Sequence, residues 1–214
     1  MARPSTTSTK KTGKTARQSV REASRAAYRQ AIMDAAVQIF GRTGFRAAKI
    51  ADIATEAGVA TGTLYNYFTS KEEIFQSILD DGRDRLRADI GALMSVEDPL
   101  ERLHEVVRAM FDFLEENGAL FMIHMQLGAN PTDFKAADEA DERFRHELLA
   151  FLGGTIAAAG ERMRQDIPPE TQSWVLGGLM HGAITQWIFG GCQPGLRHKA
   201  DTIMDVFLNG ATPR

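Results

Sequence analysis

Cysteine is almost missing from this chain of 214 residues, which contains a single one, Cys192. One cysteine forms no disulfide within the chain and cannot build a zinc site of the cysteine-rich kind, so both frameworks are excluded. This usage is typical of the reducing cytoplasm, and a redox role for Cys192 would need a partner on another molecule. With 43% hydrophobic and 25% charged residues, the chain is also neither wholly disordered nor collagen-like.

Apolar segments suited to secretion or to a membrane are scarce. Residues 1–15 are polar and basic, without the apolar stretch of a secretory signal peptide. Residues 171–196 carry no Asp, Glu, Lys or Arg, but they contain six glycines and several polar side chains that lipid would leave without partners. We therefore expect a helix buried against its own domain and a second subunit, in a cytoplasmic protein with no membrane partner.

Signatures of enzymes are few. Neither the nucleophile elbow G-x-S-x-G nor the dinucleotide-binding G-x-G-x-x-G occurs. Two His-Glu pairs, at 104–105 and 146–147, begin the H-E-x-x-H zinc pattern, but Arg108 and Ala150 stand where the second histidine would bind the metal. The acidic residues between 138 and 142 are interpreted as a solvated helix face. We expect no catalytic residues, no metal and no cofactor.

Charge of one sign is concentrated at one end of the chain. Residues 1–71 hold 12 Lys and Arg against 4 Asp and Glu, whereas residues 72–214 hold 13 against 24, which gives net charges of +8 and −11. Such asymmetry indicates a polyanion-binding part joined to a part with another role. DNA, RNA and an anionic membrane surface are the polyanions that remain open. Residues 1–24, rich in Thr, Ser, Lys and Arg, are expected to form a flexible basic arm.

The rest of the chain has the spacing of helices and shows no sustained strand alternation. Apolar residues at positions 32, 35, 36, 39 and 40 share one face of a first helix. A capping box of Ser70 and Glu73 predicts a helix that starts at Lys71, and Asp98 followed by Pro99 predicts the start of another. A short, very apolar sixth helix is expected over residues 119–127. The fold class is therefore all-α, with about nine helices.

Two short helices joined through Gly58 and Val59 have the spacing of a helix-turn-helix. Glycine suits a turn that needs a positive φ, and an apolar residue fills the angle between the two helices. Leu64 and Phe68 are expected to face inward, which leaves the other residues of the second short helix to face outward. An ordinary helical corner has the same spacing, but the charge of +8 favours a DNA-binding motif.

The segment from Ile53 to Glu72 resembles the signature of TetR/AcrR-family transcriptional regulators, and the resemblance covers about residues 29–79. It implies an all-helical homodimer in which residues 25–71 form a helix-turn-helix DNA-binding domain and residues 72–214 form a helical ligand-binding and dimerisation domain. Two positions depart from the family pattern. Ala48 and Ala60 stand where the family places hydroxyl residues at the starts of the second and third helices, so the local caps are expected to be weaker.

The resemblance also implies which residues contact DNA. Cationic and hydroxyl side chains reach phosphates, amides read base edges, and glycine permits close approach, so the expected contacts are Arg46, Lys49, Thr61, Gly62, Thr63, Tyr65, Asn66, Tyr67 and Lys71. Lys71 begins a helix, where the positive end of the dipole favours a phosphate. The basic arm is expected to add affinity without much specificity through Lys10, Lys11, Lys14, Arg17 and Arg21.

The acidic part has two expected surfaces. Uncharged residues of the eighth and ninth helices are expected to make the dimer: Trp174, Leu179, Ala183, Trp187, Ile188, Ile203, Val206 and Phe207. An apolar inducer pocket between helices five to eight is expected to be lined by Met110, Phe111, Leu114, Phe121, Met122, His124, Met125, Met180 and His181. Any one of these residues would equally serve to fill a core.

The length and layout of this part resemble family members that respond to fatty acyl thioesters. Arg108, Arg162 or Arg164 could then meet an acidic head group, while aromatic ligands stay open. The sequence thus predicts a ligand-responsive regulator, a repressor that a small lipophilic inducer releases from a palindromic operator on double-stranded DNA. The alternative is a nucleic-acid-binding protein without sequence preference.

Overall fold

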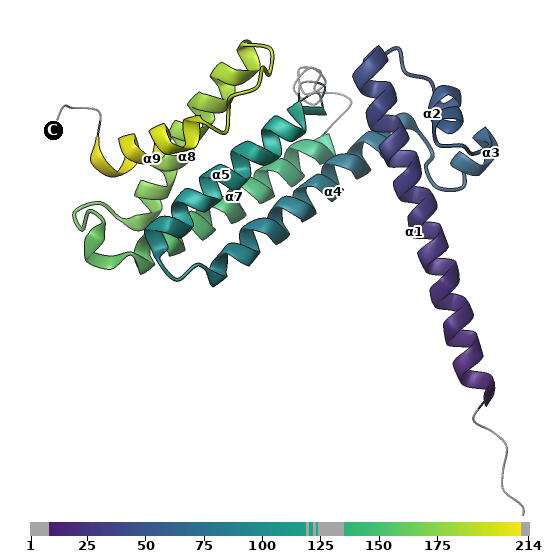
Figure 1. The fold of residues 1–214 in the computed structure, drawn as a ribbon, viewed down its shortest axis with the longest axis horizontal. Coiled ribbons are helices and arrows are strands. Elements are labelled where there is room, and N and C mark those ends of the chain that lie inside the picture. Colours follow the sequence, from purple (N-terminus) through teal and green to yellow (C-terminus); the bar gives the residue numbers. More distant parts are fainter. Residues whose placement is uncertain (1–8, 119, 122, 124–134, 211–214) are drawn as a thin grey trace, which may run out of the picture. The chain divides into compact units, whose positions relative to one another are not determined.

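The computed structural model describes residues 9–118, 120, 121, 123 and 135–210, and among these residues it contains helices and turns but no strand (Figure 1). The chain divides after Ile78 into two compact units. The first unit contains α1 (Thr9–Thr43), α2 (Ile50–Glu56), α3 (Thr61–Leu64) and the start of α4 (Lys71–Ala92). The second contains the rest of α4, η1 (Leu93–Ser95), α5 (Pro99–Glu116), α7 (Lys135–Ala158), η2 (Gly160–Arg162), α8 (Pro169–Phe189) and α9 (Lys199–Asn209). The expected all-α fold is confirmed. Residues 124–127 of the expected sixth helix lie outside the described residues, whereas residues 120, 121 and 123 are helical.

The first helix is much longer than its apolar stripe. α1 begins at Thr9, so residues that composition predicts as an irregular arm are its first turns. Residues 16–30 are rich in Ala, Arg, Gln and Glu, which lose little side-chain freedom in a helix. Residues 18–28 are exposed throughout, so this part of α1 depends on intrinsic propensity rather than on packing.

The core of the first unit forms around three phenylalanine rings. Phe40 of α1 lies 5.1 Å from Phe45 and 5.8 Å from Phe75 of α4, measured between ring centroids, and Phe45 and Phe75 are 5.3 Å apart. Ile74 and Ile78 of α4 are buried as well. Because these first two turns of α4 bury their apolar face in the first unit, the division follows Ile78 rather than Lys71 as the sequence suggests.

Two helix starts are set by local capping, as the sequence predicts. α4 begins at Lys71, and the Ser70 hydroxyl accepts the N–H of Glu73 at 3.1 Å. The Glu73 carboxylate accepts the hydroxyl and the N–H of Thr69 at 2.7 and 2.6 Å, and these bonds lower the pKa of Glu73. α5 begins at Pro99, directly after its N-cap Asp98.

Asp98 joins two elements of the second unit. Its carboxylate accepts hydrogen bonds from the N–H groups of Leu100 and Glu101 at 2.7 and 3.2 Å. It also accepts hydrogen bonds from both terminal nitrogens of the Arg162 guanidinium at 2.6 and 2.8 Å. The guanidinium of Arg162 and these N–H groups hold the pKa of Asp98 well below its usual range. A carboxyl whose pKa is lower in the folded state stabilises the fold above its unfolded pKa, and this contribution is lost as the pH falls.

Replacing Asp98 by asparagine separates the charge from the cap, since asparagine caps helices about as well as aspartate. We expect Asp98→Asn to lower the free energy of unfolding at pH 7, and the difference from wild type to shrink as the pH falls below about 4. Asp98→Ala should lose stability at every pH, because it also removes the cap. Urea unfolding between pH 2 and 7 measures this. An unchanged pH dependence in Asp98→Asn would contradict it.

The second unit buries an apolar core between helices that pack in pairs. α5 packs against α7 and α9, and α8 packs against the same two helices. Fully buried side chains include Leu103, Phe111, Leu152, Ile156 and Leu176. Cys192 lies partly buried at this core, and burial raises the pKa of its thiol, which disfavours the reactive thiolate.

The uncharged segment 171–196 contributes side chains to this core. Gln172 donates to the carbonyl oxygens of Arg164 and Ile167 at 2.8 and 2.7 Å, and the Trp187 indole donates to the carbonyl of Gln193 at 2.7 Å. Within the described part of the chain, every buried side-chain nitrogen and oxygen has a hydrogen-bond partner. In that same part, no helix combines the length and the apolar content needed to cross a membrane.

Candidate nucleic-acid interface

The turn between α2 and α3 depends on a glycine. Gly58 has a φ of +67°, in the left-handed region that glycine enters without steric cost. Its N–H donates to the carbonyl of Thr55 at 3.1 Å, and the N–H of Val59 donates to that of Ala54 at 2.9 Å. These two bonds form a Schellman motif, which ends α2 and sends the chain into α3. The expected helix-turn-helix is therefore present.

The second helix of this motif presents one face to solvent. Leu64 is fully buried and Phe68 nearly so, as the sequence predicts. Backbone bonds continue beyond Leu64, from Tyr65 to Thr61 at 3.2 Å and onward, so the recognition segment extends through residues 61–67. Its exposed members are Thr61, Gly62, Tyr65 and Asn66, while Thr63 and Tyr67 are partly buried. Polar side chains and a glycine on one exposed helical face are what a DNA groove requires.

Neither short helix has a side-chain cap. Ala60 is the N-cap of α3, and no side chain caps the free N–H groups there. For α2 the N-cap is Lys49 rather than Ala48, and it also makes no capping bond, while Ala48 is buried. The expectation of weak local caps is thus confirmed at Ala60, but the second position was shifted by one residue.

Lys71 has a structural role that the sequence did not indicate. Its ammonium donates to the carbonyl oxygens of Phe45, Arg46 and Ala48 at 2.9, 3.0 and 3.3 Å, and it lies 4.8 Å from the centre of the Phe45 ring. An ammonium has three N–H donors, so these three carbonyls use them all. Lys71 therefore holds the loop between α1 and α2 in place, and its expected phosphate contact would have to replace one of these bonds.

Two arginines of the first unit make hydrogen bonds or ion pairs within it, whereas some other cations of this unit have no partner in the part of the chain that the structure describes. Arg29 donates to the Tyr67 carbonyl and the Ser77 hydroxyl at 3.4 and 2.7 Å, and Arg42 forms an ion pair with Glu56. The expected contacts Arg46 and Lys49 are exposed, and neither side chain has a partner among the described residues. In addition, Arg21 and Arg25 line a groove with Asn66 and Tyr67. Sequence reasoning missed Arg25, although its spacing of four from Arg21 and Arg29 is a readable signal.

Comparison with known proteins identifies the family to which this motif belongs. The family model of the TetR family of bacterial regulatory proteins matches residues 32–78. The transcriptional repressor ComR of Escherichia coli K12 is 30% identical over 149 residues, which make up 66% of this chain and 68% of ComR. The chain belongs to the TetR family of bacterial transcriptional regulators. Its helix-turn-helix is the DNA-binding element of such regulators, as the sequence predicted.

Two further comparisons differ in how much of the chain they include. The repressor KstR2 of Mycobacterium tuberculosis is 35% identical over 94 residues, 44% of this chain and 47% of KstR2, so that match spans about half of the relative's length. The fatty acid degradation regulator FadR of Bacillus halodurans has the same fold, with a TM-score of 0.68 and 25% identity over 86% of this chain and 99% of that one. The similarity to FadR thus includes the second unit of the regulator.

The residues expected to line an inducer pocket lie in three places. Phe111, Leu114 and Met180 are buried in the core of the second unit, with Met110 and Phe121 partly buried against it. His181 is exposed on α8. The remaining three, Met122, His124 and Met125, lie outside the described residues. A groove of about 190 Å³ lies between α4 and α7, lined by Arg87, Ile90, Gly91, Phe144, Glu147, Leu148 and Phe151. The pocket remains a prediction.

Cations of the second unit are largely held by carboxylates. The three arginines proposed to meet an acidic head group each have one: Arg108 binds Glu105 and Asp201, Arg162 binds Asp98, and Arg164 binds Asp166. His104 also lies 2.7 Å from Asp201, and the described residues contain no cluster of ligands suited to a metal. An acidic head group would have to displace one of these pairs.

The residues of α8 and α9 that are expected to form a dimer differ in exposure: some face the core of their own subunit and others face solvent. Ala183 and Trp187 are buried in the core of their own subunit, and Leu179, Ile188, Ile203, Val206 and Phe207 are partly buried. Trp174 is 58% exposed, and the sequence analysis did not include Val175 and Phe189, which are 52% and 87% exposed. The apolar surface left on this face is therefore narrower than the sequence suggests, because α8 is apolar on nearly all sides.

Lys71 and Lys49 form a matched pair for separating structure from DNA contact. We expect Lys71→Met to lower the free energy of unfolding by about 1–3 kcal/mol, because three carbonyl oxygens lose their donor. Lys49→Met should leave stability within about 0.5 kcal/mol, because this exposed side chain has no described partner. It should instead reduce the slope of log affinity for DNA against log salt by about 0.9 per subunit, about 1.8 for the dimer, because each subunit loses one phosphate contact.

Thermal unfolding and binding titrations over a salt series measure both effects. If Lys71→Met unfolds like the wild type while losing about 0.9 of salt slope per subunit, Lys71 is a phosphate contact and its bonds to the loop carry no stability.

Proposed function

We propose that this regulator binds a palindromic operator as a homodimer through residues 61–67 and the cations beside them. The observation that carries the proposal is the exposed polar face of the recognition segment, in a unit where the exposed side chains of Arg46 and Lys49 have no partner among the described residues. Two recognition helices related by a twofold axis read half-sites one helical turn apart, about 34–36 Å along B-DNA. Phosphate contacts by the cations fix the register, and the side chains of Thr61, Tyr65 and Asn66 read the bases.

Selection of bound sites from random double-stranded DNA tests this proposal. We expect an inverted repeat to be enriched, and substitutions of Thr61 to change the enriched bases rather than the overall affinity. Equal affinity for the selected site and for random duplex at the same salt concentration would favour the alternative, a nucleic-acid-binding protein without sequence preference.

An uncharged face of α8 supports the homodimer. Trp174 and Phe189 are fifteen positions apart, about four helical turns, so they lie on similar sides of the helix. Between them, Gly178 and Gly182 are exposed, and a Cβ added at either would meet nothing within 4 Å. Glycines flanked by exposed aromatic residues allow a second helix to approach closely, and a monomer seldom leaves such an apolar patch in water.

The second unit is proposed to bind a small lipophilic inducer that releases the repressor from DNA. Support comes from the phenylalanine and methionine residues of α5 and α8 and from the full-length similarity to a fatty acid degradation regulator. Fatty acyl thioesters are the first class to try, because they combine a long apolar chain with an acidic head group. The inducer would favour a conformation in which two DNA-binding units no longer fit adjacent grooves, with α4, which runs from the first unit into the second, as the connecting element.

The inducer proposal is tested by two measurements on the same samples. Fatty acyl-coenzyme A is expected to raise the melting temperature and to weaken operator binding, whereas coenzyme A alone should do neither. A ligand that stabilises the protein but leaves operator affinity unchanged would break the proposed linkage.

A further inference from the structure

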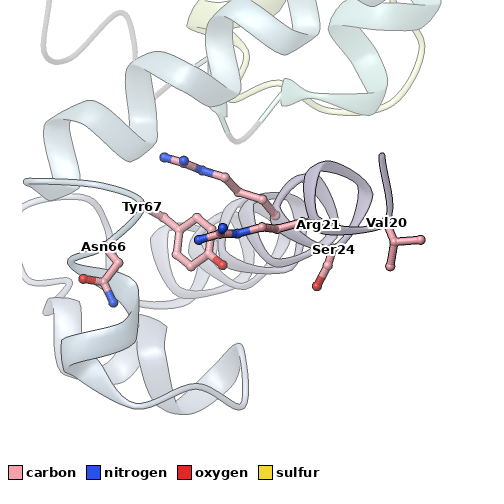
Figure 2. Close-up of a pocket in the computed structure, with 6 residues that line it drawn as sticks. Val20, Arg21, Ser24, Asn66 and Tyr67 are labelled. Atoms are coloured by element: carbon pink, nitrogen blue, oxygen red, sulfur yellow. The ribbon is translucent and has the colours of Figure 1, made fainter. Parts of the chain in front are cut away.

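A groove in the first unit lies between α1 and the end of the recognition segment. It has a volume of about 500 Å³ and is lined from α1 by Val20, Arg21, Ser24 and Arg25, and from the segment after α3 by Asn66 and Tyr67. Figure 2 shows the α1 side chains and Tyr67 on its two sides. Neither guanidinium of the groove has a hydrogen-bond or ion-pair partner among the residues that the structure describes.

Most arginines of the second unit, in its described part, have a partner, unlike these two. Arg83, Arg87, Arg108, Arg162 and Arg197 each hold a carboxylate within 3.0 Å. The groove therefore keeps two cations available, whereas carboxylates neutralise most described arginines of the second unit. A hydroxyl from Ser24 and an amide from Asn66 add neutral donors, so the lining suits an anion that accepts several hydrogen bonds.

A third arginine of the same row fixes the geometry of the groove. Arg21, Arg25 and Arg29 are spaced by four, so they follow one side of α1. Arg29 donates to the Tyr67 carbonyl and lies 4.3 Å from the centre of the Phe68 ring. The rings of Tyr28 and Tyr67 are 6.0 Å apart. These contacts attach α1 to the recognition segment, so the two unpaired arginines are held at a set distance from Tyr67.

We propose that this groove is a second DNA contact, in which Arg21 and Arg25 bind backbone phosphates of the strand that passes Tyr67. The inference rests on the proposed function, since it takes DNA as the partner of the first unit. Asn66 and Tyr67 belong to both the recognition segment and the groove. DNA backbone that contacts them therefore continues past the two guanidiniums, outside the bases that the recognition segment reads. Because a helix carries the arginines, they contact defined phosphates rather than following the backbone as a flexible arm would.

The test combines a charge-removing variant with DNA that lacks single charges. Arg21→Gln/Arg25→Gln keeps polarity and helix propensity, and Arg143→Gln/Arg145→Gln on α7 of the second unit removes the same charge from other exposed positions. The groove variant is expected to reduce the salt slope by about 1.8 per subunit, about 3.6 for the dimer on its operator, and to weaken binding at 0.1 M salt by about tenfold or more, without changing the melting temperature. The α7 variant should match the wild type.

Duplexes in which one phosphate at a time is replaced by a neutral methylphosphonate locate the contact. We expect one or two substitutions beside the half-site to weaken the wild type but not the groove variant, and all other substitutions to weaken both equally. If both proteins respond alike at every phosphate, and the salt slopes agree, the groove does not bind DNA. Failure of the proposed function gives a different result: site selection then returns no preferred sequence, while the salt slopes on random duplex still decide for or against the groove.

Discussion

Replacing Trp174 and Phe189 by aspartate is expected to convert the regulator into a monomer and to weaken operator binding by about 10²–10⁴-fold. Both side chains lie on the exposed, uncharged face of α8, so the substitutions place charge in the interface without disturbing the core of the subunit. A dimer binds its second half-site at a high effective concentration, and a monomer loses this advantage. Sedimentation at micromolar concentration should then give a single species of 23.6 kDa.

Met94→Asp is the matched control for this experiment. Met94 is 57% exposed and belongs to η1, outside α8. It should sediment as the wild type and keep its operator affinity. A Trp174→Asp/Phe189→Asp variant that still sediments as a dimer, with unchanged circular dichroism, would place the interface elsewhere.

Gly58→Val is expected to destabilise the first unit by at least about 2 kcal/mol and to abolish operator binding, because a β-branched residue is strained at a positive φ. A Cβ at this position meets nothing within 4 Å, so the cost comes from the backbone and not from a clash. Gly58→Asn should lose far less, because asparagine tolerates the left-handed region. Unfolding and binding titrations of both variants measure this. If both variants lose stability and operator affinity equally, the cost comes from the size of the added side chain and not from the positive φ at this position.

Local sequence rules predicted the features that depend on near neighbours. Ser70 with Glu73 and Asp98 with Pro99 marked the starts of α4 and α5, and Gly58 marked the turn of the helix-turn-helix. Each rests on hydrogen bonds or dihedral preferences within a few residues, which a sequence displays directly. Composition failed for α1, because a basic, polar segment without an apolar stripe still forms a helix when it continues one already nucleated by Ile32 and its neighbours.

Features that depend on distant contacts were not readable. Lys71 reaches carbonyls of residues 45, 46 and 48, and no sequence pattern marks such a contact. α8 carries apolar residues on nearly all of its sides, so their periodicity did not show that Trp187 faces the core while Trp174 faces solvent. The DNA contacts and the inducer pocket stay predictions for a related reason: ligands, rather than neighbours in the chain, define them.

The carboxylates that hold the arginines of the second unit also affect how the protein finds DNA. Pairs such as Arg83 with Asp141 occupy the cations of the second unit, which has an excess of acidic charge, while Arg46 and Lys49 of the first unit have no partner among the described residues. The two units therefore carry net charges of opposite sign. A polyanion attracts the cations of the first unit and repels the acidic second unit, so encounters that begin with the helix-turn-helix unit are favoured and the association rate rises. This guidance acts over about 10 Å at 0.1 M salt and weakens as salt is added.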